Sequence, residues 1–237
     1  MADTAYLPDL EIQGSDRLEF PRHSLVVRVT HWITALSFLS LLVSGILILI
    51  AHPRLYWGET GGVGAPSLID LPIPFKIGYS GWGRYLHFPS AWVSVATGVV
   101  YLLAGLFTRH FRSNLLPARR DLSWKSIWRS ILVDLRLKRP TKEESQTYNV
   151  LQRLAYLVVV FVLFPLILLS GLAMSPAIAS VFPALVNGFG GQQSARTVHF
   201  FVACLLVLFL FVHLVMVSLA GFTSRTWAMI TGRSTHE

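Results

Sequence analysis

Four long apolar stretches constrain the fold of this chain more than any other feature. They cover residues 33–50, 88–108, 154–174 and 200–222, and His213 is the only Asp, Glu, Lys, Arg or His within them. Each is about long enough, as a helix, to cross a hydrocarbon core of roughly 30 Å. The sequence therefore predicts an all-α integral membrane protein, a four-helix bundle.

Composition agrees with lipid as the solvent. The 237 residues are 53% apolar and only 14% charged, which lies outside the usual range of soluble domains. Cys204 is the single cysteine, so disulfides within the chain, cysteine-ligated iron–sulfur clusters and a covalent CxxCH haem site are excluded. The residues before the first stretch are mixed and partly acidic, unlike a secretory signal, and we expect them to be retained.

The distribution of basic residues predicts the orientation in the membrane. Ten Lys and Arg lie between the second and third predicted helices, in residues 109–149, and three lie in residues 51–86 after the first, so the ten-charge segment is expected to be cytoplasmic. The net charge of +8 then reflects topology, and no nucleic-acid partner is expected. We expect a single membrane domain, 1–237, with cytoplasmic tails 1–23 and 223–237, spanning helices 24–50, 87–108, 150–174 and 196–222, periplasmic loops 51–86 and 175–195, and a cytoplasmic loop 109–149.

Two of these loops contain amphipathic patterns. In the cytoplasmic loop, Trp124, Ile127, Trp128 and Ile131 fall on one helical face with basic residues off it, which is typical of a helix lying in the membrane surface. Binding of a partner by this helix is the alternative. Residues 176–186 show a weaker pattern of the same kind. The loop 51–86 is rich in Gly and Pro, which predicts turns rather than a long element.

Histidines near the apolar stretches need an explanation, because ionisable residues at membrane depth are costly and tend to be functional. His31, His87, His199 and His213 meet this condition, and the other four fall in predicted loops or tails. His199 and His213 are fourteen residues apart on one predicted helix, so they lie within about 40° of one face and about 21 Å apart along the axis. This separation is too large for one shared metal ion but suits two haems, one above the other.

The predicted topology pairs these histidines by depth. His87 and His199 are level near the periplasmic side, whereas His31 and His213 are level nearer the cytoplasm. The expected cofactors are therefore two haem b groups, each held by two histidines as metal ligands. Ligation of this type leaves no open coordination position for a substrate, which suits electron transfer.

Small residues near the histidines suggest space for a haem ring. Gly98 lies nearly on the face of His87, and Gly45 follows His31 by fourteen residues, so each glycine is expected to let a ring approach the backbone. The first and third helices also share a Ser-Gly pair, at 44–45 and 170–171. This pair indicates either close helix packing through small residues or room for a macrocycle.

Three arginines each precede a candidate ligand by three residues: Arg28, Arg84 and Arg196. Residues three apart are neighbours on a helix, so each guanidinium is expected to pair with a haem propionate. Snorkelling of the arginine to lipid headgroups is the alternative.

Three segments carry a resemblance to a known family. The segment 28–32 (RVTHW), the segment 148–156 (YNVLQRLAY) and the helix with His199 and His213 resemble blocks of the bacterial cytochrome b561-type di-haem cytochrome b subunits. These subunits belong to formate dehydrogenases, nickel–iron hydrogenases and thiosulfate reductases. The segment 52–59 (HPRLYWGE) looks closest to the thiosulfate-reductase-like branch, whose members are often paired with molybdopterin oxidoreductases.

The resemblance implies a subunit of the bacterial cytoplasmic membrane that moves electrons between the quinone pool and a periplasmic catalytic subunit, with a molybdopterin oxidoreductase favoured as partner. It also implies a quinone site near the cytoplasmic-side haem, and the candidates there are Arg28, Trp32, Asn149, Gln152 and Arg153. A proton-relaying transporter and a haem-free membrane anchor are the alternatives. The chain lacks Asp and Glu in its apolar stretches and has no obvious inverted repeat, which disfavours a transporter.

Overall fold

The computed structural model describes residues 24–62, 64–73, 81–108, 154–219 and 221–232. Four helices in these ranges are long and apolar enough to cross a membrane. They are α1 (Leu25–Ala51), α2 (Trp82–Phe107), a third helix over Leu154–Ala173, and α8 (Gln192–Leu219). The third helix contains a π-helical turn, η2 (Val159–Leu163), followed by α5 (Phe164–Ala173). The predicted all-α membrane bundle is confirmed.

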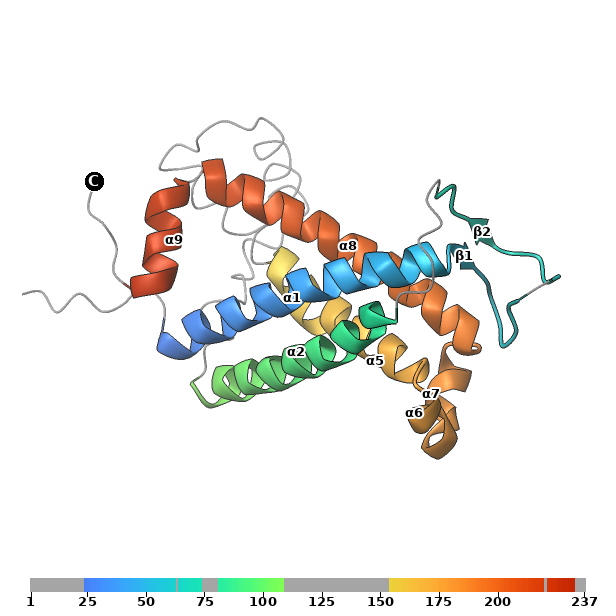
Figure 1. Ribbon diagram of the computed structural model, residues 1–237. Coiled ribbons are helices and arrows are strands. Elements are labelled where there is room, and N and C mark those ends of the chain that lie inside the picture. The colour runs from blue at the N-terminus through green and yellow to red at the C-terminus, as the bar shows by residue number, and fades with distance from the viewer. Residues whose placement is uncertain (1–23, 63, 74–80, 109–153, 220, 233–237) are drawn as a thin grey trace, which may run out of the picture.

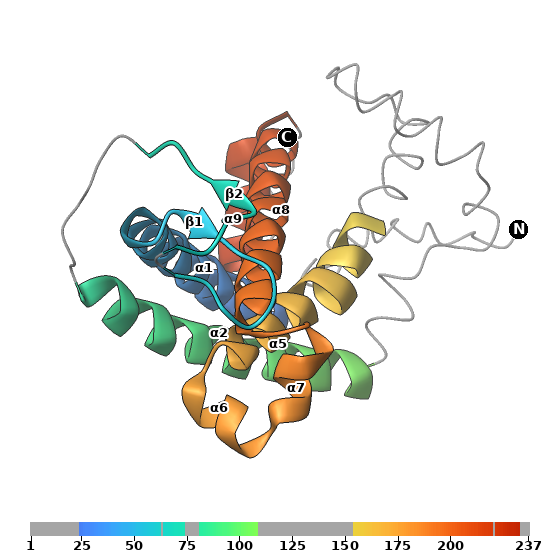
Figure 2. The same cartoon turned by 90° about the vertical axis from the view of Figure 1, so that its right-hand side faces the viewer.

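The four spanning helices associate mainly as two antiparallel pairs. α1 packs along α2, and α5 packs along α8 (Figures 1 and 2). One end of the bundle carries the short strands β1 (Arg54–Leu55) and β2 (Ile69–Asp70) and the short helices α6 (Pro176–Val181) and α7 (Pro183–Gly188). We call it the hairpin end. The opposite end, the α9 end, carries α9 (Phe222–Thr231), which turns back from α8 toward the start of α1 (Figure 1).

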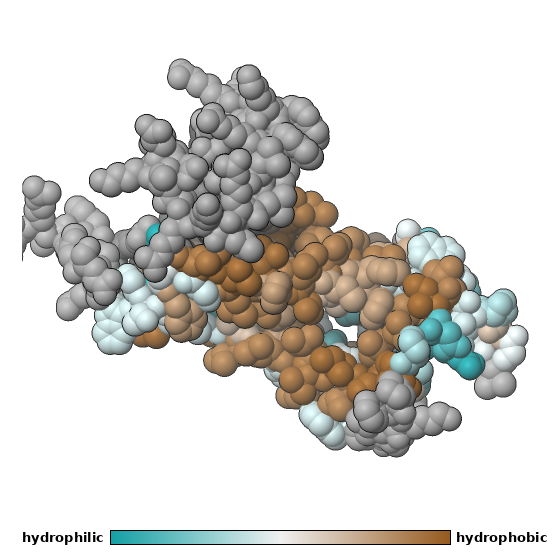
Figure 3. All heavy atoms as spheres, turned by 90° about the horizontal axis from the view of Figure 1, so that it is seen from above, coloured by the Kyte–Doolittle hydropathy of each residue, from teal (hydrophilic) through white to brown (hydrophobic). Residues whose placement is uncertain are grey.

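The packing is typical of a membrane bundle, with small residues inside and large apolar side chains outside. The buried residues of α1 are Thr30, Ser37 and Ser44. Its exposed residues include Leu36, which is 67% exposed. Figure 3 shows the hydrophobic surface that results along the helices, with more hydrophilic residues at the bundle ends. Small side chains at helix contacts let backbones approach, and lipid covers the bulky ones.

Two helices begin earlier than expected from the sequence, and α8 ends at Leu219, before the expected 222. α2 begins at Trp82 rather than at position 87, and α8 begins at Gln192 rather than at 196. The apolar stretches mark the hydrocarbon-spanning part, whereas a helix continues into the interface, where water satisfies its end groups. The start of α1 agrees with the expectation, because Ser24 is its N-cap. The Ser24 hydroxyl accepts a hydrogen bond from Val27 N at 3.4 Å.

Three connecting segments differ from expectation. The loop after α1 contains a two-residue antiparallel pairing, Arg54 with Asp70 and Leu55 with Ile69, in addition to turns. The single amphipathic helix expected over 176–186 is instead two helices, α6 and α7, because Pro183 disfavours helical backbone at the residue before it. The expected C-terminal tail contains α9, which glycines with positive φ bound on both sides. The predicted tail 1–23 and the loop 109–149 lie outside the described residues.

A junction connects the β1–β2 loop to the start of α8. Gln193 N donates to Gly58 O at 3.0 Å, and Gly58 N donates to Ser194 Oγ at 2.7 Å. Thr197 Oγ1 donates to Tyr56 O at 2.6 Å. These hydrogen bonds hold the β1–β2 loop against the first turns of α8.

Candidate functional site

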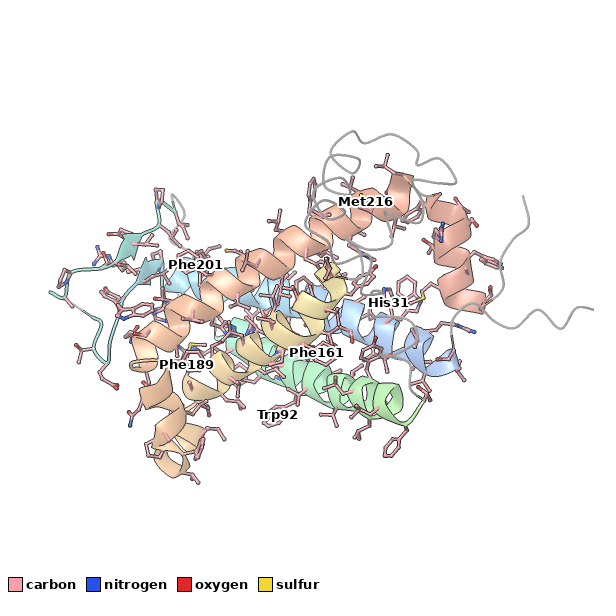
Figure 4. All side chains as sticks on the ribbon, turned by 180° about the vertical axis from the view of Figure 1, so that it is seen from behind. His31, Trp92, Phe161, Phe189, Phe201 and Met216 are labelled. Atoms are coloured by element: carbon pink, nitrogen blue, oxygen red, sulfur yellow. The ribbon has the colours of Figure 1, made fainter. Side chains whose placement is uncertain are left out.

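The structure brings the four candidate histidines together as two pairs. At the hairpin end, the ring centroids of His87 on α2 and His199 on α8 are 6.3 Å apart. Toward the α9 end, the centroids of His31 on α1 and His213 on α8 are 6.4 Å apart. Figure 4 shows His31 on α1 at the side of the molecule nearer α9, remote from Phe189 at the hairpin end. These are the two pairings expected from depth.

The spacing within each pair fits one metal ion between two imidazoles. A metal–imidazole nitrogen bond of about 2.0 Å and a ring radius of about 1.1 Å on each side give a centroid separation of roughly 6.2 Å. Both observed separations are close to this value. No group of three or more His, Cys, Asp or Glu forms a metal site among the described residues. Each pair is therefore suited to a metal that carries its remaining ligands with it, as haem iron does.

Serine hydroxyls contact the hairpin-end pair. Ser44 Oγ on α1 lies 2.9 Å from His87 Nδ1, and Ser170 Oγ on α5 lies 3.0 Å from His199 Nδ1. The sequence shows the Ser-Gly pairs, but helix packing and space for a macrocycle were the expectations for them. Their hydrogen bonds to the histidines depend on helix rotation, which spacing along a single helix does not determine.

The glycines have different neighbours. A Cβ at Gly45 would lie 3.7 Å from His87 Cε1, so Gly45 faces the hairpin-end histidine and not His31, from which its position was argued. A Cβ at Gly98 would lie 2.7 Å from Phe164 Cε1. Gly98 thus gives the ring of Phe164 access to the backbone of α2. A haem contact at either glycine stays a prediction.

Two of the three arginines meet near His52, a residue expected from the sequence to lie in a loop. Arg196 Nη2 donates to His52 O at 2.5 Å, and Arg84 Nη2 lies 3.5 Å from His52 Nε2. Desolvation by burial and the positive charges of Arg196 and Arg84 lower the pKa of His52 below its ordinary value of 6.5. The result is a cationic cluster of His52, Arg84 and Arg196 beside the hairpin-end pair, suited to an anionic group.

The third arginine, Arg28, lies at the α9 end. Its Nη2 donates to Ile230 O on α9 at 2.7 Å, and its Nε is buried with no hydrogen-bond partner among the described residues. Trp32 Nε1 donates to Met229 O at 3.4 Å. Arg28 and Trp32 thus hold α9 against α1. The remaining quinone candidates, Asn149, Gln152 and Arg153, lie outside the described residues.

Aromatic rings contact His213, a feature that was not predicted from the sequence. Phe209, one turn earlier on α8, stacks on the His213 ring at 5.9 Å between centroids. Tyr156 approaches the same ring edge-on at 6.4 Å. On the other side, Trp32 meets His31 edge-on at 5.4 Å. The second pair therefore lies in a largely aromatic environment.

A family model described as prokaryotic cytochrome b561 matches residues 22–232, a range that includes all four histidines. The chain belongs to the prokaryotic cytochrome b561 family. This cytochrome b561-type protein is similar to the putative protein-methionine-sulfoxide reductase subunit YedZ1 of Azospira oryzae. The two are 33% identical over 213 residues, which cover 89% of this chain and 96% of the relative. No solved structure matches it.

Family membership makes this cytochrome b561-type chain a membrane electron-transfer subunit and implies haem b as its cofactor. Haem b is held without covalent bonds, in agreement with the single cysteine. The histidine pairs described above are the candidate sites for it.

Proposed function

We propose that this cytochrome carries two haem b groups and transfers electrons between the quinone pool and a periplasmic oxidoreductase subunit. The observation that carries the proposal is the separation of about 6.3 Å within both histidine pairs, which leaves room for one iron between the two rings of each pair. His87 and His199 would hold one haem, and His31 and His213 the other. Bound haem supplies one-electron transfer without an open coordination position.

The arginines would bind the anionic edges of the cofactors. The cluster of His52, Arg84 and Arg196 would bind propionates at the hairpin end, where charge-assisted hydrogen bonds are strongest in partly buried surroundings. At the other end, the buried Nε of Arg28 is a donor available to a propionate or to a quinone carbonyl. Burying such a donor without an acceptor costs free energy, which favours a bound acceptor there.

The proposed orientation puts the α9 end in the cytoplasm and the hairpin end in the periplasm. It rests on the basic residues between α2 and the third spanning helix. A quinone site would then lie near Arg28, Trp32, Asn149, Gln152 and Arg153, on the cytoplasmic side of the bundle. A cytoplasmic (inner) membrane of a bacterium is the matching location.

The partner would dock at the hairpin end. The relative in Azospira oryzae is named as a subunit of a reductase, which supports a catalytic partner for this chain as well. A molybdopterin oxidoreductase is favoured by the resemblance of the segment 52–59 to thiosulfate-reductase-like subunits. Both connections at this end, the β1–β2 loop and α6–α7, would contribute to the docking surface.

A haem count on the purified protein tests the proposal. We expect two b haems per chain in a dithionite-reduced minus oxidised spectrum with a pyridine haemochrome assay. His31→Ala and His213→Ala should each remove the same haem, and His87→Ala and His199→Ala should each remove the other. His236→Ala, outside every apolar stretch, is the control and should retain both. Fewer than two haems in the unmodified chain contradict the proposal.

The same variants separate the alternatives. A haem-free membrane anchor retains its partner in His213→Ala and loses no spectral signal, because it has none to lose. A proton-relaying transporter loses transport but has no quinone-linked electron transfer. For the proposed cytochrome, His213→Ala abolishes reduction of the partner by a quinol.

A further inference from the structure

The two serines at the hairpin-end pair form matching arrangements on both halves of the bundle. Ser44 and Ser170 are both fully buried, and each is followed by a glycine. A Cβ at Gly171 would lie 3.4 Å from His199 Cε1, as a Cβ at Gly45 would lie 3.7 Å from His87 Cε1. In both halves, a Ser-Gly pair on one helix receives the histidine ring of the helix packed against it.

The proton of each hydroxyl determines the direction of the hydrogen bond to the histidine. Ser44 Oγ lies 2.8 Å from Ser40 O, and Ser170 Oγ lies 2.7 Å from Leu166 O. A carbonyl has no proton, so two oxygens this close attract each other only when the hydroxyl donates to the carbonyl. The hydroxyl then presents a lone pair to the imidazole, and the histidine Nδ1 must carry the proton and donate it.

This direction fixes the histidine tautomer. With the proton on Nδ1, the neutral ring has its free lone pair on Nε2, which is the atom available to a metal. We propose that Ser44 and Ser170 are positioning residues that hold His87 and His199 in this tautomer and orient their Nε2 atoms toward one haem iron. The inference rests on the proposed function, because it concerns how the chain prepares two of the proposed ligands.

Helix packing alone is the competing explanation. Buried serines often return a hydrogen bond to the preceding turn, as Ser37 does by donating to Ile33 O at 2.7 Å. Ser37 lies on the same helix as Ser44 and is also buried, but it makes no hydrogen bond to a histidine within the described part of the chain. It is therefore a matched control for the loss of a buried hydroxyl.

The expected effect concerns the iron. A hydrogen bond accepted from Nδ1–H raises the basicity of the ligating imidazole, and a more basic ligand stabilises ferric over ferrous iron. Replacing Ser44 by alanine removes the acceptor of His87 and makes the haem easier to reduce. Ser170→Ala acts in the same direction but less strongly, because the backbone of Ile167 also accepts a hydrogen bond from His199. We expect the reduction equilibrium of that haem to change by up to about tenfold per serine, which is about 59 mV upward for one electron.

Redox titration of the full-length protein tests this inference. Ser44→Ala and Ser170→Ala should each raise one midpoint potential, the one that His87→Ala eliminates, and should change the low-spin ferric EPR g values of that haem. Ser37→Ala should change neither. Selective loss of the same haem in a serine variant also supports the inference, because an unsupported ligand binds iron less well.

Two outcomes would overturn it. Serine variants that keep two haems and match Ser37→Ala in both potentials would reduce the serines to packing residues. A shift confined to the haem of His31 and His213 would place the effect elsewhere. Failure of the proposed function is distinct from both, since it would appear already in the unmodified chain as fewer than two haems.

Discussion

Arg28 on α1 donates from its Nη2 to the carbonyl oxygen of Ile230 on α9 over 2.7 Å. This hydrogen bond joins the first and the last described helices of the chain. Trp32, one turn along α1, donates to the adjacent carbonyl of Met229 at 3.4 Å. Carbonyls at the end of a helix lack partners within it, so a cation there satisfies them and interacts favourably with the helix dipole. The end of α9 is thereby fixed close to His31.

Arg28→Met should release the end of α9. A hydrogen bond to a charged group contributes about 1.5–3 kcal/mol when buried, and the partial exposure of this one reduces the expected loss to about 1 kcal/mol. Hydrogen exchange should show several-fold faster exchange of the amides of 228–231, with little change in α1. Arg225→Met is the control, because Arg225 lies on the exposed side of α9 and should leave exchange unchanged. Equal protection in both variants would contradict the prediction.

The sequence predicted the spanning helices because lipid imposes a strict requirement. A long stretch without charges almost always forms a spanning helix, and the position of a histidine along that helix gives its depth in the membrane. Depth alone therefore predicts the pairs of His87 with His199 and of His31 with His213. The helix α9 was not predicted, because its ten residues, such as Ser224 and Arg225 beside Trp227, do not form an apolar stretch.

Contacts between helices could not be predicted from the sequence. The hydrogen bond between Ser44 and His87 depends on how α1 and α2 rotate against each other, and the hydroxyl of Ser37 shows that a similar serine has a different role. The meeting of Arg84 and Arg196 at His52 depends likewise on the path of the loop after α1. Residue type and spacing predict which residues are functional, whereas helix rotation and the path of the loop determine which residues they contact.

Gly98→Ala should destabilise the bundle through Phe164. The new methyl group would lie 2.7 Å from the Phe164 ring, closer than Cβ atoms approach other atoms in proteins, so either the Phe164 ring must turn away or α2 and α5 must move apart. Overpacking of this kind costs about 1–3 kcal/mol. Thermal unfolding in detergent should show a lower apparent Tm, and adding Phe164→Leu should restore most of it.

The control for this site is Gly81→Ala, where the nearest atom, Tyr85 Cε2, would be at an ordinary 3.6 Å. It should leave the apparent Tm close to that of the unmodified protein. If Gly98→Ala instead loses haem and Phe164→Leu does not restore it, Gly98 serves the cofactor and not the contact with Phe164.

His52 should make stability depend on pH. Its pKa is lowered in the folded protein by burial, by Arg196 and by Arg84, so between its folded pKa and 6.5 the unfolded chain binds more protons than the folded one. The free energy of unfolding therefore falls as the pH falls below 6.5, and this contribution vanishes above that pH. His52→Gln should flatten the decline in apparent Tm between pH 8 and pH 5, whereas His236→Gln should not. A decline as steep in His52→Gln as in the unmodified chain would contradict the prediction.

Gly191 supports the junction between the β1–β2 loop and α8 in two ways. Its φ of +116° is unfavourable for any residue with a side chain, and an added Cβ would lie 2.4 Å from the carbonyl carbon and oxygen of Gly58. Those are backbone atoms, which have no rotamer to change. Gly191→Ala should therefore cost about 2–5 kcal/mol, the sum of left-handed strain and a steric collision.

Two glycine controls separate the backbone strain from the steric collision. Gly64 has a φ of +88° and no atom within 4 Å of an added Cβ, so Gly64→Ala should show the strain alone, about 1–2 kcal/mol. Gly62 has neither feature, and Gly62→Ala should change stability by less than about 0.5 kcal/mol. Thermal unfolding gives the order of the three. Hydrogen exchange at Gly58 and Gln193 should increase only in Gly191→Ala, because Gln193 N donates to Gly58 O and Gly58 N donates to Ser194 Oγ at the junction. Equal losses for Gly191→Ala and Gly64→Ala would mean that the collision with Gly58 is relieved without cost, and that the loop is not held to α8 at this point.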